Sequence, residues 1–250
     1  MSEQHATLDE LARRLREAEH VAVLTGAGVS AESGLPTFRD AMTGLWSAYR
    51  PEDLATPAAF ARQPQLVWEW YAWRRQLAAQ AQPNPAHHAL ADLERRAARL
   101  TLITQNVDGL HQRAGSRAVV ELHGNLQRVI CSAERVAVDA WDETSGVPPA
   151  CPRCGSLLRP DVVWFGESLP AASLEQALAA AARCDLFLAI GTSGVVEPAA
   201  SLPRLAKRSG ATVALINLDE AAGEHVAQLV LRGPSGSLLP ALLQRAWPPA

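Results

Sequence analysis

A short apolar run, Val21-Ala22-Val23-Leu24, leads directly into a stretch of small residues that contains Gly26 and Gly28. The run has the length and the composition of a parallel strand that is buried on both faces. A strand that ends in Gly-x-Gly predicts a tight turn whose backbone N–H groups stay uncovered and can approach a phosphate group. Because the spacing is Gly-x-Gly-x-Ser and not Gly-x-Gly-x-x-Gly, the two glycines alone also fit an ordinary strand-to-helix turn.

Further apolar runs of strand length follow along the chain, and helical patterns separate them. Strands are expected at 21–25, 100–104, 119–122, 185–190 and 212–216, and helices at 8–19, 86–98, 173–182, 198–208 and 237–246. Continuous apolar runs are typical of strands covered on both faces. Their alternation with helices predicts an α/β fold with a doubly wound, Rossmann-like parallel sheet. Ligands of such sheets bind at the carboxyl ends of the strands.

Two segments interrupt this alternation. Residues 41–80 form a helix-rich insert that contains several tryptophans, and residues 125–160 carry three cysteines in a loop rich in Pro and Gly. We therefore expect one domain over 1–250 with two lobes. The large nucleotide-binding lobe is expected at about 1–40, 81–124 and 161–250, and the small discontinuous lobe at about 41–80 and 125–160.

Composition and charge exclude several classes of protein. The 250 residues are 48% hydrophobic and 20% charged, with a formal net charge of −3. This is typical of a soluble globular protein and argues against a nucleic-acid binder, which is normally basic. No apolar run approaches the roughly 18 residues of a membrane helix, and the acidic N-terminal segment argues against a targeting peptide. We expect a cytoplasmic monomer without nucleic-acid or membrane partners, whose cysteines are metal ligands or buried thiols rather than disulfides.

Polar motifs stand where three of the predicted strands end. Residues 104–111 (TQNVDGLH), 121–124 (ELHG) and 191–193 (GTS) each follow an apolar run. Histidine is the natural general base near neutral pH, and His123 lies in the second motif. Asn and Asp also suit turns, so the first motif alone leaves simple turn chemistry open.

Together with the segment 26–40, these three motifs resemble the sirtuin family of NAD-dependent protein lysine deacylases, in the same order along the chain. The resemblance runs from about residue 11 to residue 242. It implies that NAD is a consumed co-substrate and that the second substrate is an acylated lysine of a protein. The acyl oxygen attacks C1′ of the nicotinamide ribose, and the implied products are nicotinamide, O-acyl-ADP-ribose and free lysine.

The resemblance also implies roles for individual residues. His123 deprotonates a ribose hydroxyl, Asn106 and Asp108 line the nicotinamide pocket together with Ser30, and Phe38 covers the reacting ribose. His123 and Asn106 are the implied catalytic residues. The implied NAD-binding residues are Gly26, Ala27, Gly28, Ser30, Thr37, Phe38, Arg39, Gln105, Asn106, Asp108, Gly191, Thr192, Ser193, Asn217, Asp219 and Ser235.

Two groups of residues suggest how the acylated lysine is bound. Val163, Trp164 and Phe165 lie in a segment that resembles the one pairing with the substrate backbone, although an ordinary core strand remains an alternative. Tyr71 and Arg74 are spaced i, i+3 on one face of a predicted helix and can bind a carboxylate in an apolar pocket. In the family this pair marks the members that remove succinyl and malonyl groups. We therefore predict desuccinylase and demalonylase activity alongside deacetylase activity.

A structural zinc site is implied as well, because sirtuins usually hold zinc through two Cys-x-x-Cys pairs. One pair is Cys151-Pro-Arg-Cys154, whereas the other half reads Cys131-Ser-Ala-Glu134 and lacks its second cysteine. In the first alternative, the three cysteines bind zinc in a zinc-ribbon-like insert, with Glu134, another side chain or water as the fourth ligand. In the second, the lobe folds without metal. Cys184 precedes a predicted strand and is expected to be buried.

Other functions on the same fold stay open at this point. A dehydrogenase would normally show Gly-x-Gly-x-x-Gly and would produce NADH. An ADP-ribosyltransferase or an NAD hydrolase would use the same Asn106 and His123, but would leave ADP-ribose on a protein or in water. A non-catalytic reader of acyl-lysine would need neither residue. Fold alone does not decide among these functions.

Overall fold

The computed structural model describes residues 3–36 and 49–248, and every structural statement below refers to them. Its centre is a six-stranded sheet in the order β3-β2-β1-β6-β7-β8, in which all neighbouring strands run parallel. The strands are β1 (Val21–Thr25), β2 (Leu100–Thr104), β3 (Val119–Glu121), β6 (Leu186–Ile190), β7 (Thr212–Asn217) and β8 (Leu229–Arg232). The strand order reverses between β1 and β6, so a ligand crevice is expected at the carboxyl ends of these two strands.

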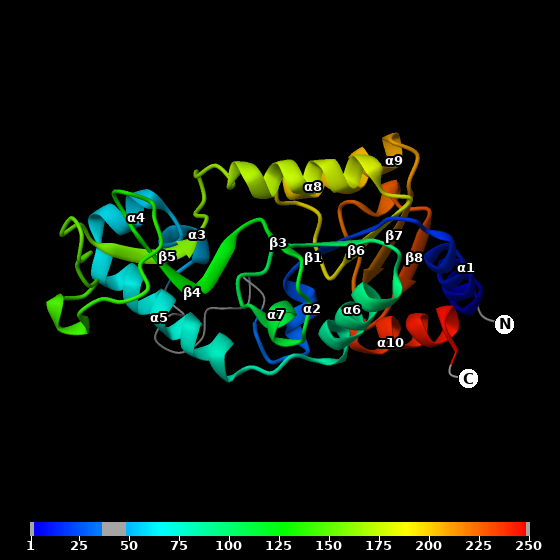
Figure 1. Ribbon diagram of the computed structural model, residues 1–250, viewed down its shortest axis with the longest axis horizontal. Coiled ribbons are helices and arrows are strands. Elements are labelled where there is room, and N and C mark those ends of the chain that lie inside the picture. The colour runs from blue at the N-terminus through cyan, green and yellow to red at the C-terminus, as the bar shows by residue number, and fades with distance from the viewer. Residues whose placement is uncertain (1–2, 37–48, 249–250) are drawn as a thin grey trace.

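Helices cover both faces of this sheet (Figure 1). One face packs against α1 (Glu3–Glu17), α6 (Pro85–Arg96) and α10 (Ser235–Ala246), and the other against α8 (Ala171–Arg183) and α9 (Leu202–Arg208). Along β1, Val21 and Val23 belong to the first hydrophobic cluster, whereas Ala22 and Leu24 belong to the second. Because side chains alternate between the faces of a strand, burial on both sides explains the continuous apolar runs in the sequence.

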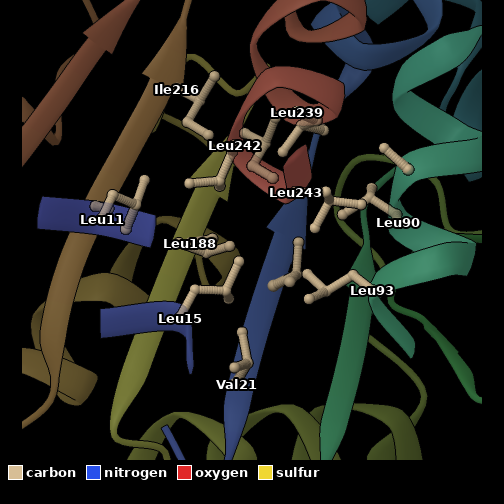
Figure 2. Packing of buried hydrophobic residues seen from close by; sticks show 14 of the residues in the cluster. Leu11, Leu15, Val21, Leu90, Leu93, Leu188, Ile216, Leu239, Leu242 and Leu243 are labelled. Carbon is tan, nitrogen blue, oxygen red and sulfur yellow. The ribbon is translucent and has the colours of Figure 1, made fainter. Parts of the chain in front are cut away.

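Leucines dominate the first of these two layers (Figure 2). Leu11 and Leu15 of α1, Leu188 of β6, and Leu239 and Leu242 of α10 are each at most 1% exposed. Complete burial of one such side chain contributes about 1.5–3 kcal/mol. This layer therefore fixes α1 and α10 on the sheet.

The predicted α/β fold with a doubly wound, Rossmann-like parallel sheet is confirmed. The strands β1 and β2 have the expected bounds, and the other expected strands and helices are present with shifted ends. Helix α1 already begins at Glu3, and the segment 198–208 starts with a 3-10 turn, η3 (Ala199–Ser201), before α9. Among the elements that were not expected are the helix α2 (Ala27–Ala31) and the short strand β8. Among the residues that the structure describes, no helix combines the length and the hydropathy needed to cross a membrane.

The two inserts lie at the end of the molecule opposite the termini (Figure 1). Their elements are α3 (Pro51–Leu54), α4 (Pro57–Arg62), α5 (Pro64–Gln80), β4 (Gly124–Cys131), η2 (Glu143–Ser145) and β5 (Leu158–Val162). Strands β4 and β5 form a separate antiparallel pair. Two hydrophobic clusters fill this region, one around Trp70 and Trp164 and one around Cys131 and Leu158. The residue numbers at which the two lobes meet stay a prediction.

Two short elements complete the fold. Helix α7 (Leu110–Arg113) begins within the first polar motif, and the 3-10 turn η4 (Glu224–Val226) lies between β7 and β8.

Candidate active site

The glycines after β1 let two loops meet at the carboxyl edge of the sheet. The Gly26 N–H donates to the Ile190 carbonyl (3.1 Å), and the Gly28 N–H donates to the Gly191 carbonyl (2.8 Å). A Cβ atom on either Gly26 or Gly28 would lie 2.8 Å from the Gly191 oxygen. Gly191 itself has a φ of 59°, and a Cβ there would lie 2.4 Å from the Val29 nitrogen. Contact between the β1–α2 turn and the turn after β6 therefore requires these glycines, whether or not a phosphate binds beside them.

The rest of the small-residue stretch is described only in part. Ala27 is the first residue of α2, and Ser30 lies near its end with 3% of its surface exposed. Thr37, Phe38 and Arg39 lie outside the residues that the structure describes. Their implied contacts to NAD stay predictions.

A buried polar cluster joins this helix to the loop after β2. The Asn106 side-chain amide donates to the Ser30 Oγ (3.0 Å) and to the Gly26 carbonyl (3.1 Å). Ser30 in turn donates to the Asp108 Oδ2 (2.8 Å), and the Leu110 N–H donates to the Oδ1 of the same carboxylate (2.8 Å). Burial raises the pKa of Asp108, and these two hydrogen bonds oppose that rise. Since both amide hydrogens of Asn106 are used, its side-chain oxygen is the atom left to accept from a ligand.

His123 is held in one tautomer by the neighbouring loop. Its Nδ1 lies 3.0 Å from the Gln105 backbone carbonyl. A carbonyl only accepts hydrogen bonds, so Nδ1 carries the proton and the lone pair lies on Nε2. Burial lowers the pKa of His123, and the Gln105 carbonyl opposes this shift. The imidazole is therefore neutral at pH 7 and offers Nε2 as a base.

Hydrogen bonds between side chains and backbone connect the ends of β2, β6 and β7. The Gln105 side-chain amide donates to the Thr192 Oγ1 (3.0 Å). Thr192 and Asn217 bind each other reciprocally, the Thr192 N–H to the Asn217 Oδ1 (3.0 Å) and the Asn217 Nδ2 to the Thr192 carbonyl (2.9 Å). Ser193 is anchored through its carbonyl, which accepts from the Ala222 N–H (3.0 Å). The predicted residues of three separate strand ends thus meet at one edge.

Two predicted NAD ligands lie farther out on this edge. The Asp219 side chain is exposed, and its backbone carbonyl accepts from the Arg232 guanidinium (3.0 Å). Ser235 begins α10, and its hydroxyl donates to the Glu32 carboxylate (3.1 Å). Among the described residues, no hydrogen bond joins Asp219 or Ser235 to the pair of Thr192 and Asn217.

Sequence reasoning missed Glu32. Besides Ser235, its carboxylate accepts from the Gly236 N–H (2.8 Å) and so connects the end of α2 to the start of α10. A Cβ on Gly236 would lie 2.5 Å from the same carboxylate. An acidic residue at the start of a helix is favourable, but its partners are more than 200 residues away in the chain.

A layer of buried polar side chains behind Ser30 was also missed. The Thr25 hydroxyl donates to the Thr104 hydroxyl (2.8 Å) and lies 2.9 Å from the His111 Nε2. The His87 Nε2 lies 3.4 Å from the Ser30 Oγ. Burial lowers the pKa of His87 to about 4 and that of His111 to about 3. Both rings are therefore neutral, and the one sequence signal was the threonine at the end of each apolar strand.

Tyr71 and Arg74 lie together on α5. Tyr71 is 1% exposed, and its hydroxyl has no hydrogen-bond partner among the described residues. The Arg74 guanidinium lies 5.5 Å from the centre of the Tyr71 ring and 5.0 Å from that of Trp70. Burial lowers the pKa of Arg74, while the Tyr71 phenol and the Asp108 carboxylate oppose this shift. The positive charge of Arg74 therefore interacts electrostatically with the Asp108 carboxylate.

The segment that contains Val163, Trp164 and Phe165 connects His123 to the helical insert. The Val163 N–H donates to the His123 carbonyl, and the Phe165 N–H donates to the Ala55 carbonyl, each at 2.9 Å. Trp164 is 2% exposed, whereas Phe165 is 45% exposed. Because β5 ends at Val162, this segment is not a core strand, although Trp164 itself is a core residue.

Three cysteines and one carboxylate meet beyond the end of β4. One ligand atom from each of Cys131, Glu134, Cys151 and Cys154 lies within 4.8 Å of all the others. The Cys131 and Cys154 sulfurs are 3.5 Å apart, and Glu134 also pairs with the Arg153 guanidinium (3.0 Å). Zinc bound by sulfur at about 2.3 Å in a tetrahedron requires ligands roughly 4 Å apart. The donor set and its spacing therefore fit a zinc ion.

All four cysteines are free thiols. Cys184 lies away from the cluster and is 5% exposed. Its thiol donates to the Ala181 carbonyl (3.6 Å), and burial raises its pKa to about 11. The expected burial of Cys184 is confirmed.

A cavity of about 480 Å³ opens at a different place, between β3, the β4–β5 pair and the start of α8. Its lining includes Glu121, Arg128 and Asp161, which are joined by ion pairs of 2.6 and 2.7 Å. Neither His123 nor Asn106 lines it. The catalytic chemistry of the chain is therefore not expected in this cavity.

Comparison with known proteins identifies relatives over almost the whole chain. The sequence model of the Sir2 family, which comprises the sirtuins, matches residues 26–198. The chain is 53% identical over 242 residues to NAD-dependent protein deacylase 1 of Pseudomonas aeruginosa, covering 94% of this chain and 97% of the relative. It is 53% identical over 244 residues to an NAD-dependent protein deacylase of Methylococcus capsulatus, covering 94% and 96%.

Solved structures share the same fold. The crystal structure of a Sir2 homologue in complex with NAD is 48% identical and has a TM-score of 0.88, over 95% of this chain and 93% of that chain. A mutant Sir2 homologue in complex with 2′-O-acetyl ADP-ribose is 47% identical with a TM-score of 0.87, over 98% and 96%. The resemblance expected from the motifs is confirmed.

Proposed function

The chain belongs to the Sir2 family, and we propose that it is an NAD-dependent protein lysine deacylase that removes succinyl and malonyl groups as well as acetyl groups. The observation that carries the proposal is the meeting of His123, Asn106 and Asp108 at the carboxyl edge of the sheet, where the charge of Arg74 also acts on the Asp108 carboxylate. The substrates are then acylated lysine side chains of proteins. Relatives about 50% identical over most of the chain are named NAD-dependent protein deacylases.

NAD supplies, when bound, a glycosidic bond whose cleavage releases nicotinamide and leaves the ribose C1′ open to attack. His123 is the general base that takes a proton from a ribose hydroxyl through Nε2. Asn106 accepts a hydrogen bond from ribose or water through its side-chain oxygen. Asp108 accepts from the nicotinamide carboxamide, and Ser30, which donates to this carboxylate, fixes its position.

Further residues of the same edge are assigned to the remainder of NAD. The Gly26 and Gly28 N–H groups are already bonded to the Ile190 and Gly191 carbonyls. The Ala27 N–H is therefore the backbone donor of the β1–α2 turn that faces the diphosphate, and the side chains after β6 and β7 hold the riboses. The residues assigned to these contacts are Gly26, Ala27, Gly28, Thr37, Phe38, Arg39, Gln105, Gly191, Thr192, Ser193, Asn217, Asp219 and Ser235.

The carboxylated acyl groups are assigned to the surroundings of Tyr71 and Arg74 on α5, called the acyl pocket below. Tyr71 offers a hydroxyl that has no partner among the described residues, and Arg74 offers the positive charge of a half-buried side chain. A succinyl or malonyl carboxylate would pair with both, whereas the methyl group of an acetyl chain would pair with neither. Val163, Trp164 and Phe165 contact the lysine stem and the peptide backbone.

A structural zinc ion is assigned to Cys131, Cys151 and Cys154, with Glu134 as the fourth ligand. The ion would fix the loops that follow β4 and precede β5. It has no part in the transfer of the acyl group. The monomeric state and the cytoplasmic location expected from the sequence belong to the same proposal.

The experiment that tests the activity uses NAD and two peptides of one sequence, one with acetyl-lysine and one with succinyl-lysine. NAD-dependent loss of either acyl group, followed by peptide mass and abolished in His123→Ala, is expected. Nicotinamide release with both peptides unchanged would contradict the deacylase assignment and favour an NAD hydrolase or an ADP-ribosyltransferase. Loss of acetyl without loss of succinyl would contradict only the assignment of the acyl pocket.

A further inference from the structure

We propose that the indole N–H of Trp164 is a third hydrogen-bond donor for the carboxylate of a succinyl or malonyl group, beside the Tyr71 hydroxyl and the Arg74 guanidinium. The inference rests on the proposed removal of such groups. Trp164 then determines acyl specificity and does more than fill the core.

The indole nitrogen is buried without a partner. Trp164 is 2% exposed, and its Nε1 makes no hydrogen bond to any of the described residues. A buried donor without a partner is unfavourable, and the large majority of buried side-chain donors in proteins are paired. The unpaired N–H therefore points to a ligand that is absent from the protein alone.

The Tyr71 hydroxyl is also buried without a hydrogen-bond partner among the described residues, and the Tyr71 and Trp164 side chains are neighbours. The rings of Tyr71 and Trp164 are 6.3 Å apart at their centres and inclined by 33°. Burial raises the pKa of Tyr71 to about 12, and the Arg74 charge and the Trp164 N–H oppose that rise. The phenol thus keeps its proton at neutral pH and remains a donor, while the indole N–H is near it without completing a hydrogen bond.

Two neutral donors and one cation in an apolar surrounding define the chemistry of the ligand. The neighbours of Trp164 and Tyr71 are largely apolar, because both belong to a hydrophobic cluster with Phe60 and Val162. An acceptor with two oxygen atoms and a negative charge satisfies all three groups, as a carboxylate does. An acetyl methyl group would leave both donors unpaired.

Trp164 is also held rigidly, with a cation on its ring. The Arg159 guanidinium carbon lies 3.3 Å from the ring centre, and its side chain is 3% exposed. Arg159 binds both oxygens of Glu167 (2.7 and 2.9 Å), and Glu167 also accepts from the Trp164 backbone N–H (2.9 Å). The stacked cation withdraws electron density from the indole and strengthens its N–H as a donor. The donor is therefore fixed in place before the substrate binds.

The test removes the N–H and keeps the shape of the ring. Trp164 is replaced by 3-benzothienylalanine through amber suppression, which exchanges the N–H group for sulfur. We expect the ratio of kcat/KM for succinyl-lysine to that for acetyl-lysine, on one peptide sequence, to fall about tenfold, as for loss of one hydrogen bond to a charged group. The ratio cancels effects on NAD binding and on the peptide backbone that both substrates share.

The matched control is the same replacement at Trp68, which packs against the hydrophobic cluster around Cys131 and Leu158. Its ring centre lies 5.5 Å from the Arg75 guanidinium. It should leave the ratio unchanged. If incorporation at Trp164 fails to give folded protein, Trp164→Phe also removes the N–H, and the same fall is expected.

The outcomes separate this inference from the proposed function. An unchanged ratio in the Trp164 variant, together with a lowered ratio in Arg74→Met, would overturn the role of the indole and keep the acyl pocket. Wild-type protein that removes acetyl but no succinyl would overturn the pocket itself. A fall in the ratio at Trp164 but not at Trp68 supports the inference.

Discussion

The Nδ1 atom of His123 donates to the backbone carbonyl of Gln105 across 3.0 Å, and this bond joins the ends of β3 and β2. The tautomer of the proposed base is therefore set by a bond to the loop that also carries Asn106. Because a backbone carbonyl cannot donate, the free nitrogen of the ring is Nε2 in its unprotonated form. A backbone carbonyl at the end of a neighbouring strand, and not a second titratable side chain, therefore orients the ring of the proposed base.

The first prediction concerns the dependence of activity on pH. Burial lowers the pKa of His123 from its ordinary value of 6.5. As the pH falls through this lowered pKa, Nε2 is protonated and the base is lost, so activity falls only below pH 6.5. The profile of kcat/KM for NAD, which reports the free enzyme, should therefore have its acidic midpoint below 6.5, and a midpoint above that value would contradict the assignment.

The acidic midpoint assigned to His123 must be distinguished from the titration of other histidines near the site. The pKa of His87 lies at about 4 and that of His111 at about 3. Both rings are therefore already neutral at pH 6.5, the ordinary pKa of histidine. His123→Ala provides the control and should lower kcat by about 100- to 10,000-fold, as for loss of a general base.

The second prediction concerns Arg74. Substitution Arg74→Met removes the charge and keeps a long apolar side chain. The ratio of kcat/KM for succinyl-lysine to that for acetyl-lysine should fall about 10- to 100-fold, the size expected for a hydrogen bond to a charged group. Arg75→Met is the matched control, because its guanidinium donates to the Leu126 carbonyl (2.8 Å) and stacks on Trp68. A ratio that responds equally to both substitutions would argue against the acyl pocket.

The sequence was sufficient to predict which residues meet at the sheet edge. Gln105, His123 and Thr192 each follow an apolar run, and carboxyl ends of parallel strands necessarily lie side by side. The hydrogen bonds from Gln105 to Thr192 and from His123 to Gln105 are consequences of that rule.

What the sequence could not predict depends on contacts between distant segments. Glu32 receives its role from the start of α10, and only the packing of that helix reveals it. Helix α2 forms within a stretch that contains Gly26 and Gly28, although glycine disfavours helices. Contact with the turn at Gly191 stabilises this helix, and that contact is not visible in the local sequence. Strand β8 has four residues, too few for a clear pattern, and it forms because β7 offers an edge.

The third prediction concerns the metal. Protein purified without chelator should contain about one zinc ion per chain, and Cys151→Ser should lose the metal and melt at a lower temperature. Glu134→Cys supplies a fourth thiolate and should keep its zinc at chelator concentrations that remove it from the wild type, since thiolates are softer ligands for zinc. A zinc content near zero in the wild type would show instead that the lobe folds without metal.

The last prediction concerns the ion pair beneath Trp164. The side chains of Arg159 and Glu167 are 3% and 12% exposed, so Glu167→Gln leaves a buried guanidinium without its counter-ion. The variant should lose about 3 kcal/mol of unfolding free energy at pH 7, at the lower end for a buried pair because part of Glu167 remains exposed. Glu197→Gln breaks an exposed pair with Arg204 (2.8 Å) and should change stability little.

The pH dependence of the same variant gives an independent check. Burial raises the pKa of the Glu167 carboxyl. The Arg159 guanidinium and the backbone N–H of Trp164 together lower this pKa by more and hold it at about 2, below its ordinary value of 4.5. A lowered pKa stabilises the folded state above pH 4.5, and this contribution is lost as the pH falls toward 2. Urea unfolding at pH 7 and pH 3 should therefore show a larger loss of stability for the wild type than for Glu167→Gln. Equal losses would mean that Arg159 does not hold this carboxylate in solution, and the rigid support of Trp164 would have to come from packing alone.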